Sequence, residues 1–138
     1  MRAFALADES VSLFRGLQAD GSLAEVLITL GHVLRAQGAL PEARQALTEA
    51  LRLAWSVGPR LMVAGALEGL ASVEAQQGQT PLAVQLLSAA SALRVQMGTP
   101  VRPADQSAVE GALAGARVIL GDNAFADVWS KAQAQPLE

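Results

Sequence analysis

The amino-acid sequence predicts an all-α protein, a solenoid of antiparallel helix pairs with a period of about 40 residues and about seven helices. Hydrophobic residues make up 51% of the 138-residue chain but aromatic residues only 4%, so Ala, Leu and Val must build the core. Ala and Leu are among the strongest helix formers, and no segment shows the alternating pattern of a strand. The stretch Leu27–Ala50 has a copy 40 residues later, and self-similarity at such a period is typical of helical repeats.

The two copies share residues that begin, end and pack helices. The matched pairs are Leu30 with Leu70, Gly38 with Gly78, Pro41 with Pro81, Ala43 with Ala83, Leu47 with Leu87 and Ala50 with Ala90. A glycine ends the first helix of each copy, because Gly enters the left-handed conformation of a C-cap at little cost. A proline starts the second helix, where its missing N–H loses no hydrogen bond. Each copy is therefore predicted to be a helical hairpin with a tight turn.

Apolar spacing and turn residues divide the single predicted domain, residues 1–138, into four parts. They are a half repeat at 1–20, full repeats at 22–58 and 59–98, and a diverged terminal repeat at 103–134. After a first helix that ends near Leu17, the predicted helices are Leu23–Gln37, Pro41–Val57, Pro59–Gln77, Pro81–Met97, Pro103–Leu120 and a short one from Asp122. Three polar residues are expected to cap helix starts: Ser22, in a capping box with Glu25, then Thr80 and Asp122.

Charge and composition argue against several classes of protein. The net charge is −3 and the ten cations are dispersed, whereas nucleic-acid binding depends on clustered cations, so we expect no direct nucleic-acid contact. The lack of Cys removes disulfides and thiolate metal sites. No apolar run approaches the ~18 residues of a membrane span, and Asp8 and Glu9 interrupt the first apolar stretch. We therefore expect a cytoplasmic protein without membrane contact.

Residues for catalysis are scarce. An enzyme must bring a nucleophile, a base or a metal together, and this chain has one His, no Cys, no Tyr and scattered carboxylates. We expect no enzymatic activity and no cofactor. Asp105, Asp122 and Asp127 could suggest a metal cluster, but each lies near a predicted helix start, where a carboxylate caps amides and complements the helix dipole. Capping is the favoured role.

The first full repeat carries a pattern of large and small residues. It runs Leu27-x-x-Leu30-Gly31-x-x-Leu34 in the first helix and Ala43-x-x-x-Leu47 in the second. This pattern resembles the tetratricopeptide repeat, which implies a right-handed solenoid, although the period exceeds the usual length of about 34 residues. In the second copy Ala71 replaces the glycine, and Glu74 falls where an apolar residue belongs.

Three longer stretches extend this likeness over essentially the whole chain. They are ALTEALRLAWSVG, LEGLASVEAQQGQTPLAVQLLSAASALR and LGDNAFADVWSKAQA, the last with Phe125 and Trp129 in a recurrent ending. They resemble the C-terminal arrays of MalT-like and LuxR-type ATP-dependent bacterial transcription regulators. The resemblance implies a non-enzymatic protein-interaction or regulatory module, the sensing or scaffolding segment of such a regulator. An inducer-sensing domain, with a small-molecule pocket between repeats, is the alternative. The sequence has neither a GxxxxGK[ST] motif nor a basic recognition helix.

In the tetratricopeptide pattern, the first helix of each repeat lines a concave groove. The residues of this chain at groove positions are Glu25, Ile28, His32, Arg35, Glu68, Ser72 and Gln76. The resemblance implies contact with a protein or peptide partner or with a small-molecule inducer, and an ordinary solvated face is the alternative. Some repeat proteins hold a peptide's C-terminal carboxylate with Lys and Asn at such positions. Neither residue type stands there, which argues against that ligand.

In the helix after Pro103 the equivalent positions are Ala108, Gly111 and Gly115, which predict either tight helix packing or a blunt end of the groove. His32, the single histidine, could contact a ligand or sense pH, or be a hydrogen-bonded surface residue.

The first helix lacks its partner in the repeat, so Phe4, Val11 and Phe14 are expected to leave an apolar patch uncovered. Because the ends of solenoids normally need a polar cap, this patch predicts self-association, a homodimer through the N-terminal helix. Trp55 and Trp129 are predicted to pack between helices in a core poor in aromatic residues, with partner contact as the alternative.

Overall fold

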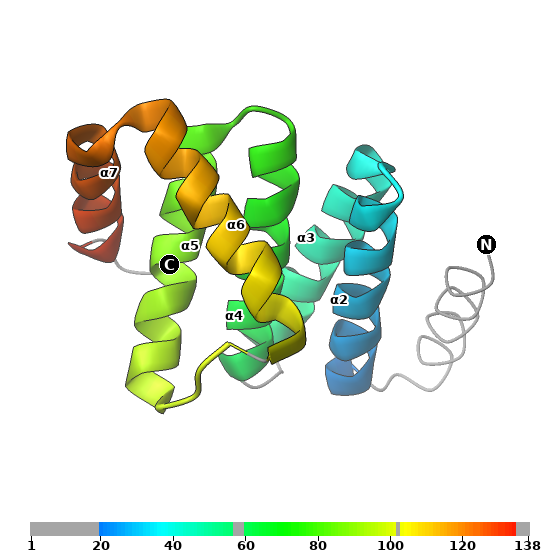
Figure 1. The fold of residues 1–138 in the computed structure, drawn as a ribbon. Helices are drawn as coiled ribbons and strands as arrows, with labels where there is room; N and C mark the ends of the chain where they lie inside the picture. The colour runs from blue at the N-terminus through cyan, green and yellow to red at the C-terminus, as the bar shows by residue number, and fades with distance from the viewer. Residues whose placement is uncertain (1–19, 57–59, 102, 135–138) are drawn as a thin grey trace.

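The computed structural model describes residues 20–56, 60–101 and 103–134, and every regular element in these ranges is an α-helix. The helices are α2 (Asp20–Ala36), α3 (Leu40–Ser56), α4 (Arg60–Gln76), α5 (Thr80–Met97), α6 (Pro103–Leu120) and α7 (Asp122–Ala134) (Figure 1). This part of the chain is all-helical, as the sequence predicts. The predicted break at residues 58–59 and the helix of the predicted half repeat lie outside the described residues.

The turn from α2 into α3 is closed by backbone groups alone. Gly38 has a φ of +80°, in the left-handed region that glycine enters at little cost. The Ala39 N–H donates to the Leu34 carbonyl of α2 at 2.9 Å, and the Ala39 carbonyl accepts the Ala43 N–H of α3 at 2.9 Å. Ala39 therefore ends one helix and begins the next, and the predicted glycine cap is confirmed.

The turn from α4 into α5 repeats this geometry and corrects one prediction. Gly78 again has a φ of +80°, and Gln79 bonds back to α4 at 2.8 Å and forward to α5 at 3.0 Å. Gln79 is the N-cap of α5 and makes no side-chain cap bond, while Thr80 is the first residue of the helix and is buried. The prediction that Thr80 caps α5 is wrong, because the backbone turn starts the helix one residue earlier.

Two other predicted caps lie inside their helices. α2 begins at Asp20, so Ser22 does not stand at its start, and the capping box with Glu25 is wrong. The Gly121 carbonyl accepts the Phe125 N–H at 3.0 Å, which makes Gly121 the N-cap of α7. Asp122 is one residue further in, in the first turn, where its carboxylate complements the helix dipole.

Among the described helices, α2 lies at one end and α7 at the other, with α4 and α5 between them (Figure 1). α2 packs on α3, α3 on α4 and α4 on α5, and beyond these neighbours α2 contacts α4, and α4 contacts α6. α6 crosses obliquely over α4 and α5, whereas α7 packs against α5 and α6. α4 therefore contacts both α2 and α6, and we call the surface that these three helices share the face of α2, α4 and α6.

A single leucine fixes α3 against α2 and α4. Leu47 is fully buried and lies between Gly31 on α2 and Gly69 on α4. A Cβ atom at Gly69 would lie 2.7 Å from Leu47 Cδ2, and at Gly31 the same side chain leaves even less room. In the second pair of helices, Ala71 and Leu87 hold the matching positions and are buried in one cluster.

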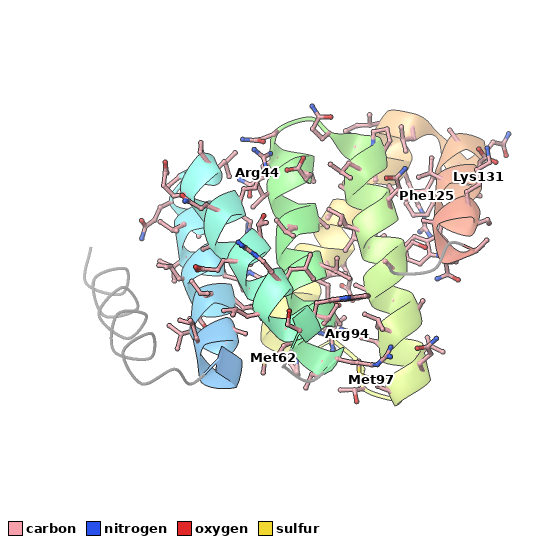
Figure 2. The ribbon with its side chains drawn as sticks, turned by 180° about the vertical axis from the view of Figure 1, so that it is seen from behind. Arg44, Met62, Arg94, Met97, Phe125 and Lys131 are labelled. Carbon is pink, nitrogen blue, oxygen red and sulfur yellow. The ribbon has the colours of Figure 1, made fainter. Side chains whose placement is uncertain are left out.

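Glu74, which breaks the apolar pattern of α4, is buried and forms an ion pair with Arg44 of α3. Arg44 Nε donates to Glu74 Oε1 at 2.7 Å, and Figure 2 shows Arg44 on α3 beside α4. A carboxylate is tolerated at an apolar position when a cation pairs with it. The departure from the repeat pattern is thus resolved by a contact between helices.

The two tryptophans differ in burial. Trp129 on α7 is half-buried and stacks on Phe125 with ring centroids 5.8 Å apart, and its carbonyl accepts a 2.9 Å hydrogen bond from Ser88 Oγ of α5. Trp55 is 51% exposed in the last turn of α3, so the prediction that it packs between helices is wrong. Ala54 points into the core, and the next residue of a helix is turned by about 100°.

Candidate binding site

The predicted groove residues recur at spacings of three or four along α2 and α4, which places each set on one helix face. The α2 set is Glu25, Ile28, His32 and Arg35, and the α4 set is Glu68, Ser72 and Gln76. Because α2 and α4 contact each other, the two strips lie side by side.

The first cavity on this face, which we name the Arg35 cavity, has a volume of about 310 Å³ and lies between α2, α4, α5 and α6. Three predicted groove residues line it, namely Arg35, Ser72 and Gln76. Arg35 Nη1 donates to Gln76 Oε1 at 3.2 Å, so the last turns of α2 and α4 are joined at the cavity.

The wall contributed by α6 consists mainly of small residues. A Cβ atom at Gly111 or Gly115 would meet nothing within 4 Å, so no neighbouring helix packs closely against these glycines in the described part of the chain. With Ala108 they line the Arg35 cavity, and tight helix packing, one of the two predicted alternatives, is wrong. Ile119 lines the same cavity and is 68% exposed. Sequence reasoning missed Ile119, although it follows Gly115 by four residues on the same helix face.

Arg35 differs from Arg44 and Arg94 in its hydrogen-bond partners. Its Nε is buried and has no hydrogen-bond acceptor in the described part of the chain. Arg44 and Arg94, by contrast, each pair with a buried glutamate. Arg35 is therefore a half-buried cation held by a neutral amide, Gln76.

The second cavity, the His32 cavity, has a volume of about 230 Å³. It is lined by Glu25, Ile28 and His32 from α2 and by Leu61 and Gly65 from α4. His32 is half-buried, and Ile28 is 6% exposed, so this end of the face combines an apolar floor with polar edges.

Glu68 lines neither of these two cavities. It is buried, and both its carboxylate oxygens accept hydrogen bonds from Arg94 of α5, at 2.5 Å from Nε and 2.7 Å from Nη2. Arg94 Nη1 also donates to the Pro100 carbonyl at 3.0 Å, which ties the connector after α5 to the end of that helix. Glu68 thus has a structural partner where the repeat pattern suggested a ligand contact.

A third cavity, the Trp129 cavity, lies between α5, α6 and α7 and has a volume of about 460 Å³. Its walls are mainly apolar, with Leu87, Val109, Leu113 and Trp129 among them, and the Glu68–Arg94 pair at one side. Sequence reasoning did not predict this hollow. The irregular stretch 98–103, which breaks the 40-residue period, was the available signal.

The predicted self-association residues Phe4, Val11 and Phe14 lie outside the described residues. Within the described ranges, no three His, Cys, Asp or Glu side chains come together as a metal site. Asp127 is exposed and pairs with Lys131 at 3.1 Å. None of the described helices is long and apolar enough to cross a membrane.

Comparison with known proteins adds no relative. No protein-family model, no curated protein and no solved structure matches this chain.

Proposed function

We propose that this chain is a non-enzymatic recognition module of tetratricopeptide type, which binds a segment of a partner protein on the face of α2, α4 and α6. The pairs α2–α3, α4–α5 and α6–α7 would be successive repeats of a right-handed solenoid. The recurrence of one backbone turn, at Gly38 and Gly78, and the contacts α2–α4 and α4–α6 support this assignment.

The observation that carries the proposal is the position of the Arg35 cavity and the His32 cavity. Six of the seven groove residues expected from the repeat pattern line either the Arg35 cavity or the His32 cavity. In the His32 cavity these residues all come from α2, whereas in the Arg35 cavity Arg35 of α2 meets Ser72 and Gln76 of α4, which a local sequence pattern alone would not bring together.

The shape of the face favours an extended segment over a compact ligand. From Glu25 to Arg35 the α2 strip spans about 15 Å, at 1.5 Å per helical residue. An extended chain rises about 3.3 Å per residue, so four or five residues of a partner would reach from one cavity to the other. Peptide recognition in grooves commonly combines such an extended path with pockets for individual side chains.

In its cellular setting the module would serve as the sensing or scaffolding segment of a larger bacterial transcription regulator. The motifs quoted from the sequence, above all the ending with Phe125 and Trp129, support this setting. In the structure these two rings stack and hold α7 on α5 and α6, a packing role that suits the last repeat of an array.

A second candidate function is the sensing of a small molecule. The Trp129 cavity favours it, because about 460 Å³ with mainly apolar walls falls in the range of ligand pockets. An inducer bound there would contact α5, α6 and α7 and leave the face of α2 and α4 open.

Selection from a displayed random-peptide library separates the two functions. We expect peptides that bind the wild-type chain and lose binding to Gly115→Leu, whose side chain enters the Arg35 cavity. Val118→Leu is the matched control, since Val118 lies on the same helix, is 85% exposed and does not line this cavity. Peptides that bind Gly115→Leu as well as wild type would contradict the proposed face. A metabolite that raises the melting temperature, with no peptide selected, would favour the sensing function.

A further inference from the structure

We propose that the Arg35 cavity receives an acidic side chain, Asp or Glu, of the segment that occupies the groove. The assignment rests on the proposed function, because the acidic residue belongs to the bound segment. It adds the chemical requirement at one position of that segment.

The first support is charge. Among the described residues that line the cavity, Arg35 is the one charged side chain, and none of them is Asp or Glu. A cation in a hollow with low-dielectric walls attracts an anion and repels a basic group. The cavity therefore has a charge opposite to the net charge of the whole chain, which is −3.

The second support is the hydrogen-bonding pattern of three arginines. Arg44 directs Nε and Nη2 to Glu74, and Arg94 directs Nε and Nη2 to Glu68. Arg35 makes its bond through Nη1 instead, and its Nε has no acceptor in the described part of the chain. Arg44 and Arg94 bind carboxylates through the edge formed by Nε and Nη2. In Arg35 this edge meets no carboxylate of the described residues.

A carboxylate suits that edge better than a neutral acceptor does. Its two oxygens match the fork of a guanidinium, and charge-assisted hydrogen bonds are stronger than neutral ones. The bond from Arg35 to Gln76 is exposed, 3.2 Å long and made to an uncharged acceptor, so a guanidinium that turned towards a carboxylate in the cavity would exchange it for an ion pair.

The third support is the size of the site. A volume of about 310 Å³ lies at the lower end of the range for ligand pockets, which is enough for one side chain and its small neighbours. The alanine and glycine walls provide close apolar contact on either side, and one cation balances one carboxylate. A phosphorylated residue, with nearly two negative charges, would remain partly uncompensated here.

Blocked pentapeptides test the assignment, with one central Glu between alanines and a Gln peptide as the neutral match. Chemical shifts of backbone amides in the ¹⁵N-labelled chain report binding. We expect the Glu peptide to shift the signals of Arg35, Gln76 and Gly115 and to bind at least tenfold more tightly than the Gln peptide. This preference should vanish in Arg35→Gln and persist in Arg52→Gln, a control at an exposed position on α3.

Each other outcome contradicts the acidic requirement, the proposed function or both. Equal binding of the Glu and Gln peptides at these signals would overturn the acidic requirement and leave the proposed function standing. Butyrate, or an all-alanine peptide with a free C terminus, binding as tightly as the Glu peptide would show that a free acid or a chain terminus is the occupant. Shifts with butyrate but with no peptide would contradict the proposed function and retain the carboxylate site. No shift with any probe would overturn both.

Discussion

Gly31 and Gly115 are both helical glycines, yet a methyl group added to each should have opposite effects. At Gly31 the new Cβ would overlap the fully buried Leu47, and such overpacking costs roughly 1–3 kcal/mol. At Gly115 it would meet nothing within 4 Å, and Ala exceeds Gly in helix propensity by about 1 kcal/mol. We therefore expect Gly31→Ala to lower the free energy of unfolding and Gly115→Ala to raise it, as measured by urea denaturation. A stabilised Gly31→Ala variant would show that Leu47 does not occupy the space between α2 and α4.

The Glu68–Arg94 pair offers a second test at the scale of the residue. Both side chains are at most 8% exposed, and removal of one partner of a buried pair costs about 3–5 kcal/mol, because the other charge stays buried. Arg94→Met should therefore lower the free energy of unfolding by that amount. The double variant Glu68→Leu/Arg94→Met should recover a large part of the loss. If the double variant is the less stable of the two, Glu68 is not the main partner of Arg94.

Sequence reasoning could not find these ion pairs. Glu68 and Arg94 are 26 residues apart, and Arg44 and Glu74 are 30 apart, so the partners meet only after the helices pack. Along the chain Glu74 was visible as a break in an apolar stripe. Which cation pairs with Glu74 depends on how α3 is rotated about its axis relative to α4, and no local sequence pattern records that rotation.

At the scale of the element, the crossing of α4 and α5 should tolerate little extra volume. Ala83 is 1% exposed and packs with Ala71 and Leu87, so a larger side chain would force the two helices apart. We expect Ala83→Leu to lower the free energy of unfolding by about 1–3 kcal/mol, measured by thermal or urea denaturation. The exposed neighbour Leu82 provides the control, since Leu82→Ala should change stability far less. An unchanged Ala83→Leu variant would mean that the register of the second repeat is wrong.

The helices were predictable because their ends carry strong local signals. Pro103–Leu120 was predicted for α6, and the structure has the same bounds. The predicted caps failed at Thr80, Ser22 and Asp122, because a side-chain cap is needed only where no backbone turn or earlier helical residue precedes it. That choice depends on how the neighbouring helix ends, as the bonds of Gln79 to both α4 and α5 show.

At the scale of the whole molecule, the 40-residue register predicts which side chains of α2 and α4 share a face, but it does not predict how far α6 stands from them. The small residues of α6 leave the Arg35 cavity open, and the connector at 98–103 breaks the period before α6 begins. Residues 98–101 of the same connector line the Trp129 cavity beside α5, α6 and α7. Both hollows result from spacing between helices, a property of the packed chain.

The central claim is that the face of α2, α4 and α6 recognises a partner segment. Photo-crosslinking measures this most directly: a display-selected peptide that carries a photoreactive group is bound to the full chain, and mass spectrometry identifies the linked residues. The account predicts links to α2, α4 and α6 around Arg35 and Gly115, and their loss in Gly115→Leu. Links confined to α3, to α7 or to the outer side of α5 would contradict it.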